Sequence, residues 1–375
     1  MPNEFFSPEG DLEKYYATEY WLIDQYIGDS LWTWGTQAGL GHNGQFSSLT
    51  PVTTFAGGIT WKQISCGYNF TAAIKTDGTL WTWGYNSNGQ LGINTTVRRT
   101  TPVTTFAGGT NWKQVSGGYR HTAAIKTDGT LWTWGYNGNG QLGINDNITR
   151  STPVTTFAGG TDWKQVSCGS NHISAIKTDG TLWTWGYNNF GQLGRKVFPL
   201  TPVTTFAGGN NWSDTATGAS EELYTICAGY SHTGAIKTDG TLWTWGYNSN
   251  GQLGINTFTT RSTPVTTFAG GITWKQISCG YNFTAAIKTD GTLWTWGSNV
   301  NGQLGDNTNI LKSTPVTTFA GGTNWKQVSC SGGNSVERIF TLAIKTDGTL
   351  WTWGSNLADF STKLTPVTTF AGGTT

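Results

Sequence analysis

Residues 118–143 read Gly-Tyr-Arg-His-Thr-Ala-Ala-Ile-Lys-Thr-Asp-Gly-Thr-Leu-Trp-Thr-Trp-Gly-Tyr-Asn-Gly-Asn-Gly-Gln-Leu-Gly, and close copies of this stretch recur along the chain. Leu-Trp-Thr-Trp-Gly occurs seven times, beginning at Leu31, Leu80, Leu131, Leu182, Leu242, Leu293 and Leu350. Pro-Val-Thr-Thr-Phe-Ala-Gly-Gly also occurs seven times, beginning at Pro51, Pro102, Pro153, Pro202, Pro264, Pro315 and Pro366. A period of about 50 residues is typical of propellers and solenoids, so this repeat decides the fold.

One repeat unit reads as four short strands. Residues 112–116 (Trp-Lys-Gln-Val-Ser) alternate in polarity and end at a Gly-Gly pair, as a strand before a turn does. Residues 121–126 form a second β-compatible run, and the Asp128-Gly129 pair suits a two-residue hairpin turn. Residues 130–134 and 153–157 complete the unit, the last with a proline that suits an edge strand.

Seven such units predict an all-β fold, a seven-bladed β-propeller of four-stranded antiparallel blades. A solenoid of the same period is the structural alternative. The expected division of the chain is a short N-terminal extension over residues 1–17 and a propeller over residues 18–375.

The stretch from Gly118 to Gly143 closely resembles the repeat of the regulator of chromosome condensation family. That family's units share a Gly-x-x-His opening, an Asp-Gly turn, a Trp-Gly pair and Asn-x-x-Gly-Gln-Leu-Gly. The resemblance covers residues 18–375 and implies a seven-bladed propeller. It says little about function, because one fold carries many functions.

The strand count leaves one place in the ring unfilled. The first strand type, headed by Trp61, Trp112, Trp163, Trp212, Trp274 and Trp325, occurs only six times. Residues 20–26 are expected to take the place of the second strand in the unit that holds Leu31. The missing innermost strand is then supplied by N-terminal residues, is absent, or comes from a partner, and the first of these is favoured.

The composition excludes several classes of protein. The 375 residues include 53 Gly and 21 Trp, and only 11% are charged, which excludes a disordered chain and a coiled coil. No apolar run is long enough for membrane insertion, and no secretory signal is visible. The net charge of +1 gives no global field toward nucleic acid, so none is expected as a partner.

Residues 1–30 hold seven acids and one base, a net charge of −6, whereas chromatin-binding members of the family carry a basic N-terminal tail. A docking segment and a solvated cap on the ring are the two readings of this region. The docking reading predicts protein partners in a larger assembly, with an anchor formed by Phe5, Phe6, Leu12, Tyr15 and Tyr16.

The copies differ at two places, the loop after the first strand and the loop after Gly-Gln-Leu-Gly, and both are expected on one face of the disc. Two insertions, residues 213–225 and 331–340, are expected on the same face. Loops on a rigid scaffold commonly carry recognition, although free drift of surface loops explains most of the variation. The candidate binding residues on this face and its inserts are Arg98, Arg120, Arg150, Arg195, Glu221, Glu222, Tyr224, Glu337 and Arg338.

The cysteines and histidines are interpreted as structural. Cys66, Cys168, Cys279 and Cys330 share one repeat position, Cys227 lies one place earlier, and no disulfide is expected because the blades separate them. His121, His172 and His232 share a position that holds Phe in other units, and equivalent points around a ring do not converge on a metal. The sequence therefore predicts no metal site.

The sequence predicts no enzyme and no cofactor. Most Trp are interpreted as packing between blades rather than as a sugar-stacking platform. The Gly-rich loops lack the Lys-Ser/Thr of a phosphate cradle, and no distinct carboxylate pair or nucleophile motif is present. Near-identical units offer similar chemistry in every blade, whereas catalysis needs distinct residues in distinct roles.

We therefore expect a non-catalytic binding or structural protein that presents its variable loop face to a glycan or protein receptor. The near-identical copies look like repeat proteins of marine bacteria and their tailed phages, which implies a virion tail, capsid-surface or cell-surface component. The resemblance to the regulator of chromosome condensation family implies guanine-nucleotide exchange or chromatin regulation as one alternative, and a propeller lectin or glycan-active protein is another. The expected location is a virion or extracellular surface, with the cytoplasm as the alternative.

Overall fold

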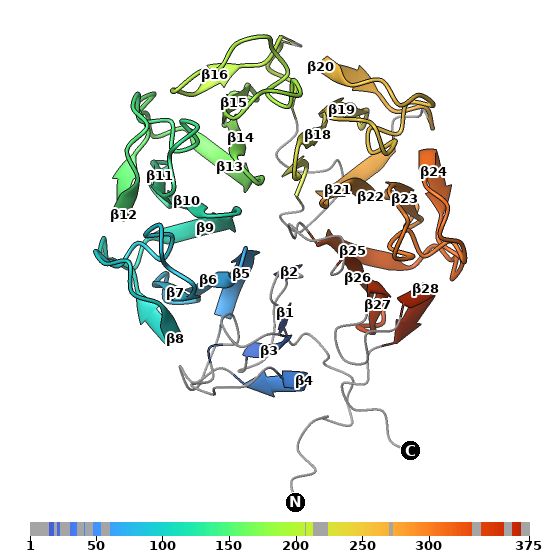
Figure 1. Ribbon diagram of the computed structural model, residues 1–375, viewed down its shortest axis with the longest axis horizontal. Helices are drawn as coiled ribbons and strands as arrows, with labels where there is room; N and C mark the ends of the chain where they lie inside the picture. Colours follow the sequence, from blue (N-terminus) through green and yellow to red (C-terminus); the bar gives the residue numbers. More distant parts are fainter. Residues whose placement is uncertain are drawn as a thin grey trace, which may run out of the picture.

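The computed structural model describes residues 15–18, 21–22, 31–35, 41, 48–53, 61–206, 208–212, 224–269, 273–331, 339–355 and 362–368. Six four-stranded antiparallel sheets are arranged as blades around a central axis (Figure 1). Within each blade the strands pair in chain order, so the first strand lies at the axis and the fourth at the rim. The expected all-β propeller is confirmed.

Blades 1 to 3 follow one another along the chain, and the outer strand of blade 3 is much shorter than those of blades 1 and 2. Blade 1 consists of β5 (Trp61–Gly67), β6 (Phe70–Lys75), β7 (Leu80–Gly84) and β8 (Arg99–Thr104). Blade 2 consists of β9 (Trp112–Gly117), β10 (His121–Lys126), β11 (Leu131–Gly135) and β12 (Arg150–Thr155). Blade 3 consists of β13 (Trp163–Cys168), β14 (His172–Lys177), β15 (Leu182–Gly186) and β16 (Val203–Thr204).

Blades 4 to 6 complete the antiparallel set. Blade 4 consists of β17 (Ile226–Ala228), β18 (His232–Ile236), β19 (Leu242–Gly246) and β20 (Arg261–Thr266). Blade 5 consists of β21 (Trp274–Cys279), β22 (Phe283–Lys288), β23 (Leu293–Gly297) and β24 (Lys312–Thr317). Blade 6 consists of β25 (Trp325–Cys330), β26 (Phe340–Lys345), β27 (Leu350–Ser355) and β28 (Thr362–Thr368).

The expected number of seven blades is wrong, because the structure has six blades of this kind. The remaining place in the ring holds a mixed sheet of β1 (Tyr15–Thr18), β2 (Trp21–Leu22), β3 (Leu31–Gly35) and β4 (Ser48–Thr53), in the order β2-β1-β3-β4. Its β1 and β3 pair in parallel. The physical reason is that the chain before Leu31 has no Asp-Gly turn, so no such turn joins β3 to an antiparallel second strand.

N-terminal residues fill the inner places of this mixed sheet. Strand β1 takes the second-strand position that was expected for residues 20–26, and β2 lies innermost, against β5 and β25. The expectation that N-terminal residues supply the missing inner strand is thus supported by the strand order, whereas the segment assigned to the second position was wrong. The division at residues 17 and 18 stays a prediction.

The contacts of the Asp-Gly turns explain why the same turn sequence recurs in the blades. Asp128 Oδ1 accepts hydrogen bonds from the Thr130 amide at 2.9 Å and from its hydroxyl at 2.7 Å, and the Trp132 indole donates to the same hydroxyl at 2.9 Å. Gly129 has a φ of +80°, and a Cβ there would lie 2.0 Å from the Thr161 carbonyl oxygen of the next blade's entry. The turn therefore needs both the aspartate and the glycine for structural reasons.

The Gln and Ser of the first strand join neighbouring blades at the axis. The Val166 amide of blade 3 donates to Gln114 Oε1 of blade 2 at 2.9 Å, and the Cys168 amide donates to Ser116 Oγ at 2.9 Å. An innermost strand has one edge without a strand partner, so its amides need other acceptors. The Trp-Lys-Gln-Val-Ser motif supplies them from the preceding blade.

Removing one of these acceptors is expected to destabilise the ring. In Gln114→Leu the amide of Val166 stays buried without an acceptor, which costs about 1–3 kcal/mol of unfolding free energy. Urea unfolding of the variant, with the exposed Thr110→Ala as control, measures this loss. An unchanged midpoint in Gln114→Leu would show that these side chains do not hold the blades together.

Tryptophans fill the space between blades. Trp112 of the first strand and Trp134 of the third are at most 1% exposed, and their ring centroids lie 6.3 Å apart. Trp134 Nε1 donates to the Gln90 carbonyl oxygen of blade 1 at 2.8 Å. Lys126 Nζ lies over both Trp112 and Trp132, at 4.8 and 4.6 Å from the ring centroids. The expected role of these rings as packing between blades is confirmed for the described residues.

Candidate functional site

The loops after the first and third strands lie together on one face of the disc, which we call the loop face. The Tyr136 amide, after the third strand of blade 2, donates to the Arg120 carbonyl oxygen, after its first strand, at 2.8 Å. The same bond joins Tyr187 to Asn171 at 2.8 Å and Tyr247 to Ser231 at 2.9 Å. The expectation that both variable loops share a face is confirmed.

A ring of tyrosines surrounds the axis on the loop face, and we call Tyr68, Tyr119, Tyr230 and Tyr281 the tyrosine crown. The ring centroids of Tyr68 and Tyr119 lie 4.5 Å apart with their planes tilted by 41°, and those of Tyr230 and Tyr281 lie 4.4 Å apart with a tilt of 45°. All four side chains are half-buried. Burial, reinforced by neighbouring tyrosines, raises the pKa of Tyr230 and Tyr281, so both rings stay uncharged at neutral pH.

Ser170 interrupts the crown at blade 3, where the other described blades from 1 to 5 have tyrosine. A hollow of about 30 Å³ at the mouth of the axis is lined by Tyr68, Tyr119 and Ser170 together with the glycines that precede them. The Arg120 guanidinium lies 4.8 Å from the Tyr119 ring centroid at the edge of this hollow. The crown thus presents aromatic rings, hydroxyls and one guanidinium around a shallow centre.

Basic side chains are spread over the loop face, from Arg120 beside the crown to the starts of the fourth strands at the rim. Within the described residues, the loops and the fourth-strand starts of the loop face carry nine bases and two acids, a net charge of +7 (Arg98, Arg99, Arg120, Arg150, Arg195, Lys196, Arg261, Lys312 and Lys363 against Asp146 and Asp306). Each acid is paired with a nearby base. Arg150 binds Asp146 at 2.6 Å, and Lys312 lies 3.5 Å from Asp306.

The structure places four of the expected binding residues on the loop face. Arg98 is exposed, Arg120 lies on the Tyr119 ring, and Arg195 lies 5.4 Å from the Phe206 ring centroid. Arg150 is held by Asp146. These arginines belong to different blades, so they surround the crown rather than converge on one point, and their role in binding stays a prediction.

The insertion at residues 213–225 does not leave from the loop face, and that expectation is wrong. Trp212 bridges to Lys237, beside the Asp239-Gly240 turn, and Ile226 pairs with Ala235 in the middle of the blade. The insertion therefore interrupts the inner strand near the opposite, turn-bearing face. Tyr224 points toward the axis, where its hydroxyl accepts a hydrogen bond from Gln63 Nε2 of blade 1.

Several expected site residues lie outside the described residues. Among the binding candidates these are Glu221, Glu222, Glu337 and Arg338, and among the anchor candidates they are Phe5, Phe6 and Leu12. The backbones of Tyr15 and Tyr16 lie in β1. The insertion at residues 331–340 begins and ends at the loop face, since it joins β25 to β26.

The tyrosine crown was missed by sequence reasoning, although a signal was present. Tyrosine follows the turn glycine in four units, at Tyr68, Tyr119, Tyr230 and Tyr281, and this regular placement was attributed only to loop variation. The four tyrosine side chains come together next to the axis only because the propeller closes, and no single repeat unit determines this.

Three histidines, His121, His172 and His232, are completely buried inside the ring. His172 Nε2 lies 2.9 Å from Thr233 Oγ1 of the next blade, and that hydroxyl itself donates to the Gln192 carbonyl oxygen at 2.7 Å, so the imidazole must donate. His232 is bound in the same way to Thr284 at 2.9 Å. Burial lowers the pKa of His121, His172 and His232 to about 3. Within the described ranges no group of three His, Cys, Asp or Glu could hold a metal ion.

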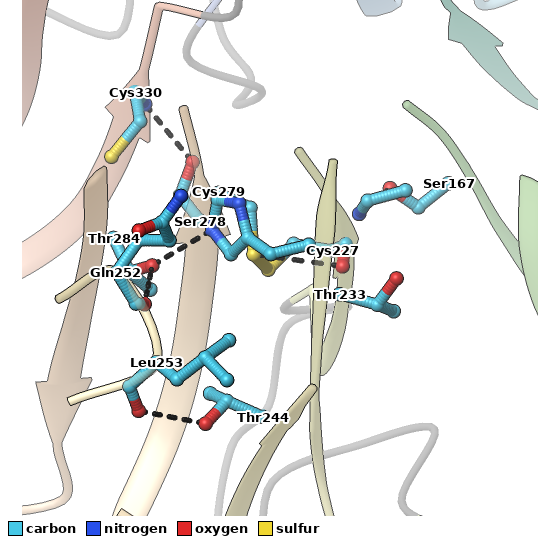
Figure 2. Close-up of a disulfide and its surroundings, with 12 residues drawn as sticks. Ser167, Cys227, Thr233, Thr244, Gln252, Leu253, Ser278, Cys279, Thr284 and Cys330 are labelled. Carbon is cyan, nitrogen blue, oxygen red and sulfur yellow. Dashed lines mark hydrogen bonds between the residues drawn. A yellow bond between two sulfur atoms is a disulfide. The ribbon is translucent and has the colours of Figure 1, made fainter. Parts of the chain in front are cut away.

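The expectation of five unpaired cysteines is wrong. Cys227 and Cys279 form a disulfide between blades 4 and 5, with Cα atoms 5.4 Å apart (Figure 2). Equivalent positions are far apart at the rim, but innermost strands converge at the axis, where this distance suits a disulfide. Cys66, Cys168 and Cys330 are buried and form no disulfide in the structure. Burial raises the pKa of Cys168 and Cys330 to about 12, so these two are not reactive thiolates.

The repeated aspartates serve turns rather than acid–base chemistry. Hydrogen bonds from the Thr130 hydroxyl, then from its amide, hold the pKa of Asp128 below its ordinary value. The same bonds act on Asp77, Asp179, Asp239, Asp290 and Asp347. In the part of the chain that the structure describes, no helix is both long and apolar enough to cross a bilayer.

Known proteins with related sequences and structures share this architecture. The ultraviolet-B receptor UVR8 of Arabidopsis thaliana is 34% identical over 289 residues, which cover 76% of this chain and 64% of the receptor. The chain thus spans less than two thirds of the receptor's length.

Solved structures agree on the fold. Prp20p from Saccharomyces cerevisiae, described together with its binding to Gsp1p and histones, is similar with a TM-score of 0.74 at 18% identity, over 93% of this chain and 87% of that one. Human WBSCR16 gives a TM-score of 0.73 at 20% identity, over 91% and 94% of the two chains. The sequence profile of the RCC1-like domain matches residues 30–360. Because this match covers most of the sequence, the chain belongs to the RCC1-like domain family.

Proposed function

We propose that the chain is a non-catalytic binding module whose loop face holds an acidic protein partner. The observation that carries this proposal is the net charge of +7 around the tyrosine crown in the described residues. Tyr, Ser and Asn, with Arg at the energetically dominant positions, are enriched in the binding loops of antibodies, because they combine rigid aromatic area with adaptable hydrogen bonds. A receptor among the relatives supports a binding role.

The opposite face does not offer the same chemistry. Each of its hairpin turns carries one lysine and one aspartate, as Lys126 and Asp128 do in blade 2. That lysine is held between two indole rings, at 4.8 and 4.6 Å from their centroids. With the first-strand lysines and Asp162 included, the described residues of this face carry eleven lysines and seven aspartates, a net charge of +4. The loop face, at +7, is therefore the more basic of the two and the better able to steer an acidic partner.

The location of the protein and its other expected activities and ligands remain predictions. A place on a virion or cell surface, with residues 1–30 as the docking segment, stays a prediction, and so does guanine-nucleotide exchange. A glycan ligand also stays a prediction. The buried first-strand and third-strand tryptophans are packed between blades and do not offer it a stacking surface.

The test measures binding of a fluorescein-labelled oligoglutamate peptide by anisotropy. Charge reversal at Arg98, Arg120 and Arg195 is expected to weaken binding by at least about tenfold, since three uncompensated bases become acids. The control reverses three turn-face lysines, Lys126→Glu, Lys237→Glu and Lys288→Glu, and is expected to have a smaller effect.

Two results would contradict the proposal. One is an equal loss of affinity in the turn-face control, which would show that binding follows net charge alone. The other is tighter binding to a single-stranded oligonucleotide of the same charge than to the peptide, which would assign the face to nucleic acid.

A further inference from the structure

The disulfide occupies a position that has another role in the neighbouring blades. Cys227 pairs with Gly234 across β17 and β18, as Ser167 pairs with Ser174 in blade 3. Cys227 therefore stands at the serine position of the Trp-Lys-Gln-Val-Ser motif, not at the cysteine position of its neighbours. The one-residue shift seen in the sequence is what turns its sulfur toward the next blade.

At the other interfaces that position carries a hydrogen bond between blades. The Gly117 amide donates to Ser65 Oγ at 3.0 Å, and the Ala228 amide donates to Ser167 Oγ at 3.0 Å. The Cys330 amide donates to Ser278 Oγ at 2.9 Å (Figure 2). Between blades 4 and 5 the disulfide takes the place of this bond.

The surrounding sequence is adapted to the two sulfur atoms. The position of Gly234 holds Ala72, Ala123, Ser174, Ala285 and Leu342 in the other blades. A Cβ on Gly234 would lie 3.3 Å from Cys227 Sγ, 3.5 Å from Cys279 Sγ and 2.4 Å from Ile277 Cδ1. Blade 4 thus departs from the repeat at two facing positions that together make room for the bond.

Blade 4 has a shorter inner strand than its two neighbours, and therefore fewer backbone contacts at the axis. Its inner strand β17 has three residues, against six in β13 and β21. Thr225 replaces the motif glutamine, and the Ile277 amide donates instead to the Tyr224 carbonyl oxygen at 3.2 Å. Tyr224 in turn reaches Gln63 across the axis. These contacts depend on a short strand that the disulfide fixes to blade 5.

We propose that Cys227–Cys279 is a thiol-sensitive link that sets the stability of the axial contacts made by Tyr224 and Ile277. A cavity of about 80 Å³ along the axis is lined by both cysteines and by Tyr224, so the bond lies at the wall of this cavity. A dithiol reductant breaks the sulfur–sulfur bond, each sulfur takes up a proton, and the two electrons come from the reductant, which becomes a disulfide.

The test is hydrogen exchange of the full chain with and without dithiothreitol. Reduction of the wild type is expected to speed exchange of the amides in residues 224–228 and 277–279 by at least about tenfold, because the short strand loses its covalent link. Cys227→Ala removes the disulfide without supplying the serine hydroxyl that links the other blades, and without dithiothreitol it should match the reduced wild type. Cys168→Ser is the control for a buried thiol that forms no disulfide.

Mass spectrometry of the digested, unreduced chain adds a second measurement that needs no variant. It is expected to show one peptide pair joined through Cys227 and Cys279 and three free thiols. Five free thiols in the unreduced chain, or identical exchange of the wild type before and after reduction, would overturn the proposal.

Discussion

Lowering the pH from 7 to 4 is expected to remove most of the stability of this propeller. The pKa of each buried histidine, His121, His172 and His232, falls from 6.5 to about 3 on folding because the charged ring would be buried. Between these values the unfolded chain binds more protons than the folded chain, so stability falls as the pH falls. Each histidine then costs about 3 kcal/mol by pH 4, on the order of 10 kcal/mol for the three, which is comparable with the whole stability of a typical domain.

The turn aspartates do not obscure this effect. Their pKa values are lowered by hydrogen bonds from the following threonine, so their contribution is lost only as the pH falls below about 4. Unfolding by urea at pH 7, 6, 5 and 4 therefore isolates the histidines. The measurement gives the slope of the unfolding free energy against pH.

Phenylalanine at the three positions is the matched control, because Phe70, Phe283 and Phe340 already occupy them in other blades. The variant His121→Phe, His172→Phe and His232→Phe is expected to show little slope between pH 6.5 and 4. If it keeps the slope of the wild type, the buried histidines are not the cause of acid sensitivity.

His121 differs from the other two histidines in a way that the single variants reveal. His172 and His232 donate to a threonine of the next blade, but the equivalent residue facing His121 is Ile173. Neither ring nitrogen of His121 has a hydrogen-bond partner among the described residues. Within the same series, His121→Phe alone should stabilise the fold at pH 7 by about 1–3 kcal/mol.

Trp134→Ala is expected to cost about 3–5 kcal/mol of unfolding free energy, as deletion of a fully buried aromatic ring does. Trp134 is buried completely, and its indole donates to the Gln90 carbonyl oxygen across the blade interface at 2.8 Å. The variant therefore leaves a cavity and an acceptor without its donor. Urea unfolding at pH 7 measures the loss.

Trp132→Ala is the matched control, two residues away on the same strand. Trp132 is half-buried, and its indole donates to Thr130 within its own turn at 2.9 Å. Its removal is expected to cost about 1–2 kcal/mol, within the usual range for partly buried positions. Equal losses in both variants would show that interface packing does not distinguish the two rings of each pair.

The local structure of each blade was predictable because it depends on neighbouring residues. The alternation of residues 112–116, the Asp128-Gly129 turn and the edge proline at 153 all led to the strands that are found. The placement of both variable loops on one face also followed, since alternate connections in an antiparallel meander lie on the same side. The crown tyrosines could have been expected from their regular position after the turn glycine.

Sequence alone determined that this chain forms a propeller of four-stranded antiparallel blades, because the periodicity of its strands and turns is local and is repeated along the chain. Tertiary structure decided how the ring closes. Six antiparallel blades and one mixed sheet form because residues before Leu31 lack the hairpin turn. It also decided that Cys227 meets Cys279, 52 residues away, and that the insertion before Tyr224 leaves from the far side of the blade. These features arise where inner strands converge on the axis, and that convergence depends on all the blades together.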